Sequence, residues 1–414
     1  MDHASPVRFL AAHETTAAGP QRQADPIPRA ACAAALRAQL PPPRPELRAC
    51  VVIPARNEAD HLPATIAALA AQTDLQGLPL PAGSFEVLVL ANNCQDDTAA
   101  LTRQLARQLP HLVLHVAELR LDSANAHVGC ARRLLMDEAC ARLEQVGQPA
   151  GLIASTDADT RVAPTWLAAT QAEIAAGADA VGGRIRTDAE RPAAAPACPT
   201  LAKLRRSLRR DATYRLLCAR LEHQLDPAPA DPWPRHYQHF GASLALTARA
   251  YRQVGGLPEV RFLEDEALCQ LLRRHDLALR HSPRVQVLTS ARRAGRVEVG
   301  LSWQLREWEQ LNQQQREPLV DNPVQLARQW QLRRQLRACW AGQAGIETEP
   351  LLTRLALPAT VLLAQVRQAA TFGVLWEWAL QHSPCLVLGQ IPLGEALAVL
   401  PPLIGSGGPA GPVG

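Results

Sequence analysis

The sequence predicts an α/β protein in which a mostly parallel, doubly wound sheet is followed by a helical C-terminal region. Between residues 50 and 290, short apolar runs alternate with segments whose apolar residues recur at helical spacing. This alternation is typical of strands joined by crossover helices. Beyond about residue 300 the strand-like runs stop, and the helical spacing continues. Ligands of doubly wound sheets bind at the carboxyl ends of the strands, where we therefore expect the functional residues.

Individual elements follow from the periodicity along the chain. We expect strands at 51–53, 85–90, 112–116, 151–155, 178–181 and 241–246. We expect helices at 59–71, 96–109, 128–146, 164–176, 200–225 and 263–274. The proline-containing segment 1–47 is expected to be a mobile lead-in, 48–300 one domain, 301–404 the helical region without strands, and 405–414 a disordered tail rich in glycine and proline.

Composition narrows the class of protein. With 414 residues, 47% of them hydrophobic, the chain can bury a sizeable core, which excludes disorder throughout. A formal net charge of only +4 gives no reason to expect a nucleic-acid partner. The ten cysteines show no C-x-x-C pair, and no apolar signal segment begins the chain. We therefore expect reduced thiols and a cytoplasmic protein.

Two apolar stretches near the C-terminus, 351–375 and 384–404, bear on membrane contact. Charged residues and prolines interrupt both stretches, whereas a bilayer span needs about 20 predominantly apolar residues. We expect packed or surface-lying helices here. Peripheral contact with the inner face of the membrane stays open, because amphipathic surface helices and core helices share this pattern.

Asp157 and Asp159 stand directly after the expected strand 151–155. Two carboxylates one residue apart, in a turn at the end of a buried strand, can hold Mg²⁺ or Mn²⁺ through oxygen ligands and leave sites for phosphate oxygens. A lone D-x-D more often caps a helix or makes a turn. The position after the fourth strand favours the metal and diphosphate site.

Glu264 and Asp265 open a helix after the turn at Gly255 and Gly256. Carboxylates here can cap the helix or act in chemistry. A base that activates an acceptor hydroxyl removes its proton on the side opposite the leaving group. We assign this role to Asp265, and Glu264 or Glu266 to acceptor hydroxyls.

Taken together, these motifs resemble family 2 glycosyltransferases of the GT-A fold. The segment 51–58 (VVIPARNE) is similar to the family's N-terminal signature, the D-x-D equivalent is 157–159, and the glycine pair at 255–256 leads to the E-D pair. The resemblance covers roughly residues 49–290. It implies an inverting transfer from a nucleoside-diphosphate sugar, assisted by a divalent cation, Mg or Mn, with Asp265 as catalytic base.

The resemblance also implies binding residues. Those near the nucleotide are Pro54, Ala55, Asn57 and Glu58, while Asp157 and Asp159 lie at the metal and diphosphate. We place the acceptor near Gly182, Gly183, Gly241, Ala242 and Glu264, since glycine permits close backbone approach. The acceptor itself, a lipid, a polysaccharide or a small metabolite, is not identified by any motif.

Three segments depart from the family pattern. Asn92 and Asn93 stand where the family often has acidic residues, and their amides can bind a base edge. Arg132 is expected to reach the diphosphate, alone or with Arg133, unless both lie on a solvated helix face. A histidine that serves some members as a metal ligand is replaced by a basic segment, whose arginines can close over the diphosphate or form a surface loop: Arg292, Arg293 and Arg296.

Other interpretations remain at this stage. His236, Tyr237 and His239 can line the acceptor pocket, although such residues beside a strand more often pack. A nucleotidyltransferase with a related core is an alternative, but the first strand lacks the glycine-rich loop that holds a triphosphate. A non-catalytic glycosyltransferase-like binding protein is another, and the intact acidic motifs count against it. The absence of G-x-G-x-x-G after the first strand speaks against a dehydrogenase.

Overall fold

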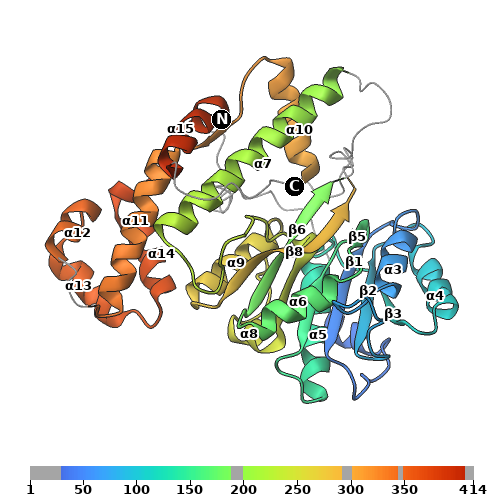
Figure 1. Ribbon diagram of the computed structural model, residues 1–414. Coiled ribbons are helices and arrows are strands. Elements are labelled where there is room, and N and C mark those ends of the chain that lie inside the picture. Colours follow the sequence, from blue (N-terminus) through green and yellow to red (C-terminus); the bar gives the residue numbers. More distant parts are fainter. Residues whose placement is uncertain (1–28, 188–198, 291–300, 344–347, 406–414) are drawn as a thin grey trace, which may run out of the picture. The chain divides into compact units, whose positions relative to one another are not determined.

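A computed structural model describes residues 29–187, 199–290, 301–343 and 348–405 (Figure 1). Its contacts divide the chain into two compact units. We call residues 25–194 and 234–304 the sheet unit, and residues 195–233 and 305–414, with 1–24, the helical unit. The chain therefore passes between the units more than once.

One eight-stranded sheet forms the centre of the sheet unit, in the order β3-β2-β1-β4-β7-β6-β8-β5. The strands are β1 (Ala49–Ala55), β2 (Phe85–Asn92), β3 (Val113–Leu119), β4 (Leu152–Ser155), β5 (Thr160–Val162), β6 (Ala180–Thr187), β7 (Leu244–Thr247) and β8 (Leu279–Thr289). Strands β1 to β4 are mutually parallel, β7 runs antiparallel to β4 and β6, and β5 runs antiparallel to β8. The predicted α/β class with a mostly parallel sheet is confirmed.

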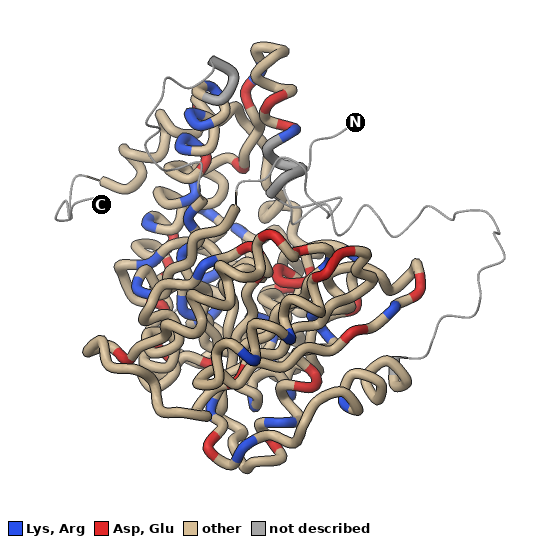
Figure 2. The backbone as a smooth tube through the Cα atoms, turned by 90° about the vertical axis from the view of Figure 1, so that its right-hand side faces the viewer, with Lys and Arg blue, Asp and Glu red and all other residues tan. Residues whose placement is uncertain are grey.

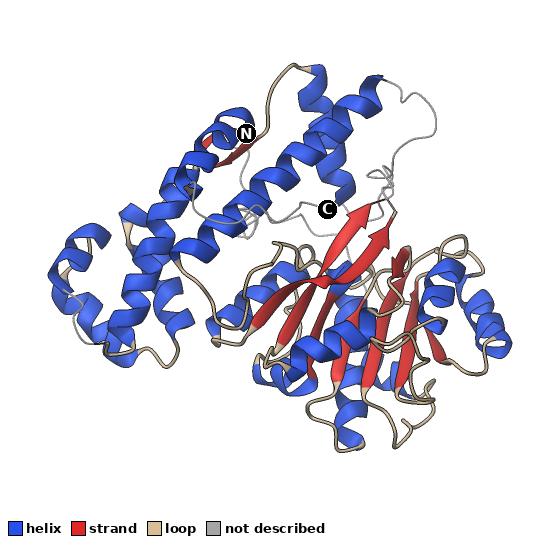
Figure 3. Ribbon diagram, in the orientation of Figure 1, coloured by secondary structure: helices blue, strands red, loops and turns tan. Residues whose placement is uncertain are grey.

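Helices cover both faces of this sheet (Figure 3). On one face lie α2 (Arg29–Arg37), α5 (Val128–Gln145), α8 (Ala248–Gln253) and α9 (Glu264–Arg274); on the other lie α3 (Leu62–Ala70), α4 (Thr98–Gln108) and α6 (Trp166–Ala175). Successive side chains of β1 alternate between the two cores, so that Val52 packs on one face and Val51 and Ile53 on the other. Each such side chain, fully buried, stabilises the fold by about 1.5–3 kcal/mol.

The sheet unit begins earlier than the sequence indicated. Residues 29–47 were expected to belong to a mobile lead-in, but α2 lies there and Leu36 and Leu47 are both buried. Leu36 belongs to the core that α5 closes, and Arg37 forms an ion pair with Glu138 of α5 at 2.9 Å. Apolar burial and one ion pair thus order a segment whose composition suggested disorder.

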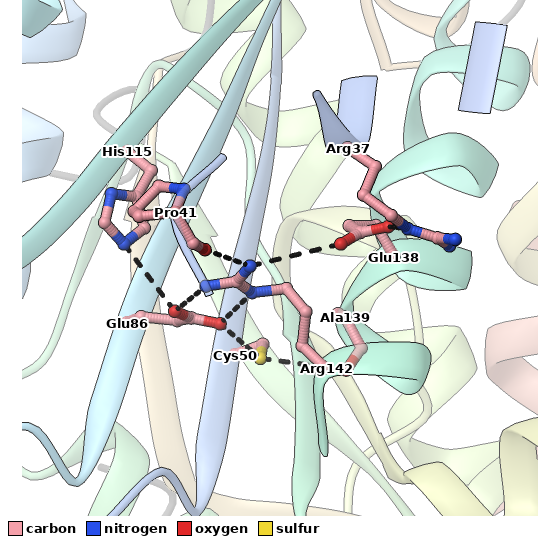
Figure 4. Close-up of polar contacts among 8 residues, drawn as sticks. All are labelled: Arg37, Pro41, Cys50, Glu86, His115, Glu138, Ala139 and Arg142. Carbon is pink, nitrogen blue, oxygen red and sulfur yellow. Dashed lines mark hydrogen bonds and ion pairs between the residues drawn. The ribbon is translucent and has the colours of Figure 1, made fainter. Parts of the chain in front are cut away.

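A buried polar network ties α5 to the sheet (Figure 4). Arg142 of α5 donates from Nε and Nη2 to the two carboxylate oxygens of Glu86 on β2, both at 2.7 Å, and from Nη1 to the carbonyl of Pro41 at 2.8 Å. Both partners of this bidentate pair are almost fully buried. The network fixes the position of α5, whose N-terminal end carries Arg132.

The helical unit contains seven described helices and one short strand pair. The helices are α7 (Pro199–Leu225), α10 (Leu301–Gln313), α11 (Pro323–Trp340), α12 (Thr348–Leu355), α13 (Ala359–Gln368), α14 (Phe372–His382) and α15 (Leu393–Ile404); β9 (Leu319–Asp321) pairs with β10 (Gln390–Pro392). Tyr214 and Leu221 of α7 pack with Trp330 of α11 and Leu400 of α15. Two predictions are corrected here: α7 groups with the C-terminal helices, and strands do occur beyond residue 300.

Neither apolar stretch near the C-terminus forms one long helix. Residues 351–375 are divided among α12, α13 and the start of α14, and 384–404 contain a 3₁₀ turn, β10 and α15. Within the described ranges, no helix has the length and apolar character that crossing a membrane requires. Basic and acidic positions are interspersed along the described backbone (Figure 2), consistent with the small net charge.

Candidate active site

The expected site residues follow three neighbouring strands of the sheet. Asn57 comes after β1, Asn93 after β2, and Asp157 and Asp159 after β4. Because β1, β2 and β4 are parallel and adjacent, their carboxyl ends meet at one edge. The turn that carries the D-x-D motif is thus placed where the sequence predicted it.

Arg132 joins this turn to the first turn of α9. Its Nη2 donates to Oδ1 of Asp157 at 2.6 Å, and its Nη1 forms an ion pair with Glu264. Arg132 is only 4% exposed, so it does not lie on a solvated helix face. A Cβ at Gly241 would overlap its guanidinium group. Glycine at 241 therefore allows the arginine to occupy this place.

Negative charge is concentrated around the guanidinium group. Burial, together with the charges of Asp159, Asp265 and Glu58, raises the pKa of Asp157 to about 6, although Arg132 opposes the shift. Asp157 nevertheless keeps 37% of its side chain exposed. Carboxylates that crowd one another in this way favour a bound cation, because a cation relieves their repulsion.

Glu264 shows the same effect more strongly because it is almost fully buried. Burial and the neighbouring charge of Asp265 raise its pKa to about 7, and the charge of Arg132 acts in the opposite direction. The charges of Glu264, Asp157 and Asp265 in turn raise the pKa of Arg132 although burial lowers it, so the guanidinium group stays charged. Glu264 thus has a close partner within the protein, which competes with its predicted role at acceptor hydroxyls.

Asp265 is held by two backbone donors. Its Oδ2 accepts a hydrogen bond from Gly241 N at 2.7 Å, and its Oδ1 accepts one from Glu266 N at 2.8 Å. Leu263, the residue before the start of α9, has φ of 57°, a left-handed conformation that is costly for a branched side chain. This turn directs the start of α9 so that Asp265 meets the segment before β7.

The glycines expected near the acceptor pack against the protein itself. A Cβ at Gly182 would overlap the carbonyl of Gln238, and one at Gly183 would overlap the hydroxyl of Ser243. Ala242 is buried, and its carbonyl accepts from the hydroxyl of Thr156 at 3.0 Å. These positions do require small residues because another group comes close to them. That group is the protein's own segment 238–243 and not an acceptor.

A cavity of about 550 Å³ opens beside the ends of β1, β2 and β3. Its lining residues are Arg56, Asn93, Cys94, Gln95, Asp96 and Arg120. The amide of Asn93 is already engaged, because Nδ2 donates to Leu121 O at 2.8 Å and Oδ1 accepts from Leu121 N at 3.0 Å. Asn92 is buried. Asn93 thus forms part of the wall of the cavity, whereas Asn92 is not among the lining residues.

The other residues predicted near the nucleotide adjoin the cavity in sequence but are not among its lining residues. Pro54 and Ala55 are buried within β1. The side-chain oxygen of Asn57 accepts from Gln95 N at 2.7 Å, and Glu58 N donates to the hydroxyl of Thr98 at 2.8 Å. These bonds hold the exit of β1 against the loop after β2, where the cavity lies.

Several residues near the site were missed or only partly recognised in the sequence. Arg120 lines the cavity, yet no motif marks it. His239 contacts Glu266 through Nε2 at 2.6 Å and His281 through Nδ1 at 3.2 Å, a network that sequence spacing does not reveal. Arg133 bonds to the carbonyl of Leu257, away from the cavity lining.

Other predicted residues are placed elsewhere or not described. His236 is buried, with Nε2 3.1 Å from Ser282 O. Tyr237 lies in the same irregular segment before β7. The three arginines expected to close over the diphosphate lie outside the described residues: Arg292, Arg293 and Arg296. Where side chains are described, no group of three or more His, Cys, Asp or Glu is arranged to hold a metal ion.

Comparison with known proteins identifies the domain that carries this site. Residues 50–216 match the family model described as glycosyl transferase family 2. The chain carries a family 2 glycosyltransferase domain. The match spans β1, the D-x-D turn and Arg132, and it confirms the predicted family and enzyme class. A comparison of this glycosyltransferase with curated proteins gave no match.

Solved structures with a similar arrangement include three glycosyltransferases. S. aureus TarS in complex with UDP is 14% identical over 80% of this chain and 87% of that chain, with a TM-score of 0.40. The mannosyltransferase PcManGT from Pyrobaculum calidifontis, in complex with GDP-Man and Mn²⁺, is 15% identical over 91% and 87%, with a TM-score of 0.42. GalNAc-T7 with UDP, GalNAc and Mn²⁺ is 13% identical over 82% and 58%, with a TM-score of 0.43.

Proposed function

We propose that this glycosyltransferase moves a sugar from a nucleoside-diphosphate sugar to an acceptor hydroxyl in one inverting displacement. The observation that carries the proposal is the double contact of Arg132 with Asp157 and Glu264. Through it the D-x-D turn after β4 and the first turn of α9, which carries Asp265, belong to one site. A site that combines a place for diphosphate with a nearby base is what this reaction requires.

Asp265 is the proposed catalytic base. The two N–H groups that bind its carboxylate hold it in one orientation. In the reaction the acceptor hydroxyl transfers its proton to Asp265, and its oxygen forms a bond to the anomeric carbon of the donor. The bond from that carbon to the diphosphate breaks, and the nucleoside diphosphate leaves on the opposite face, so the configuration inverts.

Asp157 and Asp159 are the residues that would hold a divalent cation, Mg²⁺ or Mn²⁺. Their carboxylate oxygens are the ligand type these ions prefer, and after burial the charges of Asp159, Asp265 and Glu58 contribute to the raised pKa of Asp157. The residues present therefore fit the ion. When bound, such a cation neutralises charge on the departing diphosphate. Arg132 adds a fixed positive charge beside the same turn.

The cavity beside β1, β2 and β3 is the proposed site for the nucleotide. Arg56, Gln95 and Arg120 offer hydrogen-bond donors along its lining. Asn57 and Glu58 stay predicted neighbours of the nucleotide, since they follow β1 at the same edge. The described relatives with UDP or GDP-mannose give the donors to test first.

Substitution of Asp265 tests the proposal most directly. The donor is first chosen as the UDP-, GDP-, dTDP- or CDP-sugar that raises the melting temperature most in the presence of Mn²⁺, because a ligand of the folded state stabilises it. We expect Asp265→Asn to keep that shift and to lose release of the nucleoside diphosphate. Turnover by Asp265→Asn at the wild-type rate would refute the assignment of the base.

Asp159→Ala tests the proposed cation site in the same assay. We expect it to lose the Mn²⁺-dependent part of the donor-induced shift, because the cation loses one carboxylate ligand. If no nucleotide sugar shifts the melting temperature of the wild type, the non-catalytic alternative is favoured instead. A cytoplasmic location and peripheral contact with a membrane stay predictions from the sequence.

A further inference from the structure

We propose that His239 is a positioning residue that holds the backbone N–H of Gly241 against the catalytic base Asp265. The inference rests on the proposed function, because that function gives Asp265 its role. Gly241 N donates to Oδ2 of Asp265 at 2.7 Å. This bond orients the carboxylate of Asp265.

Regular secondary structure does not fix the segment that ends at Gly241. Residues 234–240 form neither helix nor strand, and a single 3₁₀ turn at Gly241–Ser243 precedes β7. The position of Gly241 N therefore depends on side-chain contacts made by the preceding residues. His239, two residues earlier, is buried and makes two of them.

His239 connects the segment to both elements that flank the base. Its Nε2 lies 2.6 Å from Oε2 of Glu266 on α9, and its Nδ1 lies 3.2 Å from Nε2 of His281 on β8. Glu266 directly follows Asp265 and donates its own N–H to Oδ1 of Asp265. The side chain of Glu266 thus holds His239, and the backbone N–H of the same residue holds the carboxylate of Asp265.

Proton positions in this network follow from the charge of Glu266. Burial alone would raise its pKa, but the hydrogen bond and charge of His239 and the charge of Arg273 lower it to about 2. The carboxylate is therefore ionised and can only accept, so Nε2 of His239 carries a hydrogen. Its Nδ1 shares a second hydrogen bond with Nε2 of His281 at 3.2 Å. Both ring nitrogens are engaged, which fixes the orientation of the imidazole.

Further contacts of the segment lead to the sheet, and one long contact leads to α9, from the thiol of Cys269 to the carbonyl of His239 at 3.9 Å. His236 Nε2 lies 3.1 Å from Ser282 O on β8, and the side chain of Gln238 binds both Ile185 N at 2.8 Å and Ile185 O at 3.0 Å on β6. These contacts remain when His239 is replaced. Loss of the imidazole should therefore free Gly241 from Asp265 without detaching the segment from the sheet.

The test compares His239→Leu, His239→Gln and the control His115→Leu. His115 belongs to another histidine–carboxylate pair of the sheet unit, 3.7 Å from Glu86 (Figure 4), and is itself mostly buried. Turnover is measured as the nucleoside diphosphate released by hydrolysis of the donor selected above. The melting temperature of each variant, and its shift with donor and Mn²⁺, are measured beside it.

We expect His239→Leu to lower kcat roughly tenfold to a hundredfold relative to His115→Leu, the range expected for a displaced catalytic group. Donor affinity should stay unchanged, because the segment before β7 is not part of the cavity lining. His239→Gln, whose amide can both donate to Glu266 and accept from His281, should restore most of kcat.

Two results would overturn the inference. A kcat for His239→Leu within twofold of that for His115→Leu would show that the imidazole does not position the base. A loss of donor binding that accounts for the whole defect would assign His239 to the donor site instead. Turnover by Asp265→Asn would refute the proposed function itself. An inactive Asp265→Asn together with a fully active His239→Leu would refute only the role of His239.

Discussion

Replacement of Arg132 by methionine removes the one positive charge that separates Asp157 from Glu264 and keeps a side chain of similar length. Arg132 and Glu264 are each only 5% exposed in their side chains. Removal of one partner from a buried ion pair costs about 3–5 kcal/mol, because the other charge stays buried without compensation. We expect Arg132→Met to destabilise the sheet unit by this amount near pH 9.

An exposed pair of the same chemistry provides the control. Arg252 makes hydrogen bonds to both carboxylate oxygens of Glu144, but the two side chains are 63% and 41% exposed. Such pairs contribute about 0–1 kcal/mol. With about 2–4 °C per kcal/mol for a unit of this size, Arg132→Met should melt about 4–20 °C below Arg252→Met.

The pH dependence of this difference has a definite sign. Glu264 has a folded-state pKa of about 7, above its ordinary value, so ionised Glu264 destabilises the fold at high pH and the penalty is relieved as pH falls. Without Arg132, which opposes that shift, the pKa of Glu264 rises further, and so does that of Asp157 from about 6. The stability gap between variant and wild type should therefore be larger at pH 9 than at pH 6.

Thermal melting followed by circular dichroism at these two pH values measures both parts of the prediction. The reasoning is wrong if Arg132→Met melts with Arg252→Met at pH 9. It is also wrong if the gap to the wild type widens on acidification, since protonation of the carboxylates can only relieve an uncompensated negative charge.

Three further substitutions test neighbouring parts of the structure. Gly241→Ala places a Cβ on the guanidinium of Arg132, and we expect a loss of about 1–3 kcal/mol in urea unfolding; unchanged stability would contradict the close approach. Glu86→Gln leaves the buried Arg142 without its charged partner, and the expected loss is about 3–5 kcal/mol with donor affinity unchanged. Asp159→Ala should leave the melting temperature without ligand almost unaltered, and a large fall there would indicate a structural role for this carboxylate.

The sequence was informative where local pattern decides the structure. The fully buried strand β1 appears in it as an unbroken apolar run, and the D-x-D turn stands directly after another such run at β4. Since the carboxyl ends of adjacent parallel strands share one edge, the place of Asp157 followed from order alone. The α/β class and the strands β1 to β4 were predictable for the same reason.

Contacts between distant residues were not predictable in this way. Arg132 and Glu264 are 132 positions apart, and an arginine near the start of a helix has the same sequence signature whether it is solvated or buried. Gly182 correctly indicated close approach, but the sequence does not say that the approaching group is the protein's own backbone. Strands β9 and β10 have three residues each, too few to show a period.

The position of α7 in the sequence has a consequence for folding during synthesis on the ribosome. All eight strands of the sheet are synthesised by residue 289, whereas α7 waits for partners on α11 and α15. From Leu221 to Leu400 this interval lasts roughly ten to forty seconds at 5–20 residues per second. Until α15 is made, Tyr214 and Leu221 lack their partner Leu400, and before α11 is made they lack Trp330 as well, so the nascent chain exposes the apolar face of a helix that follows β6 and precedes β7. Such a helix is a natural binding site for chaperones, and shortening the chain before α15 would make that exposure permanent.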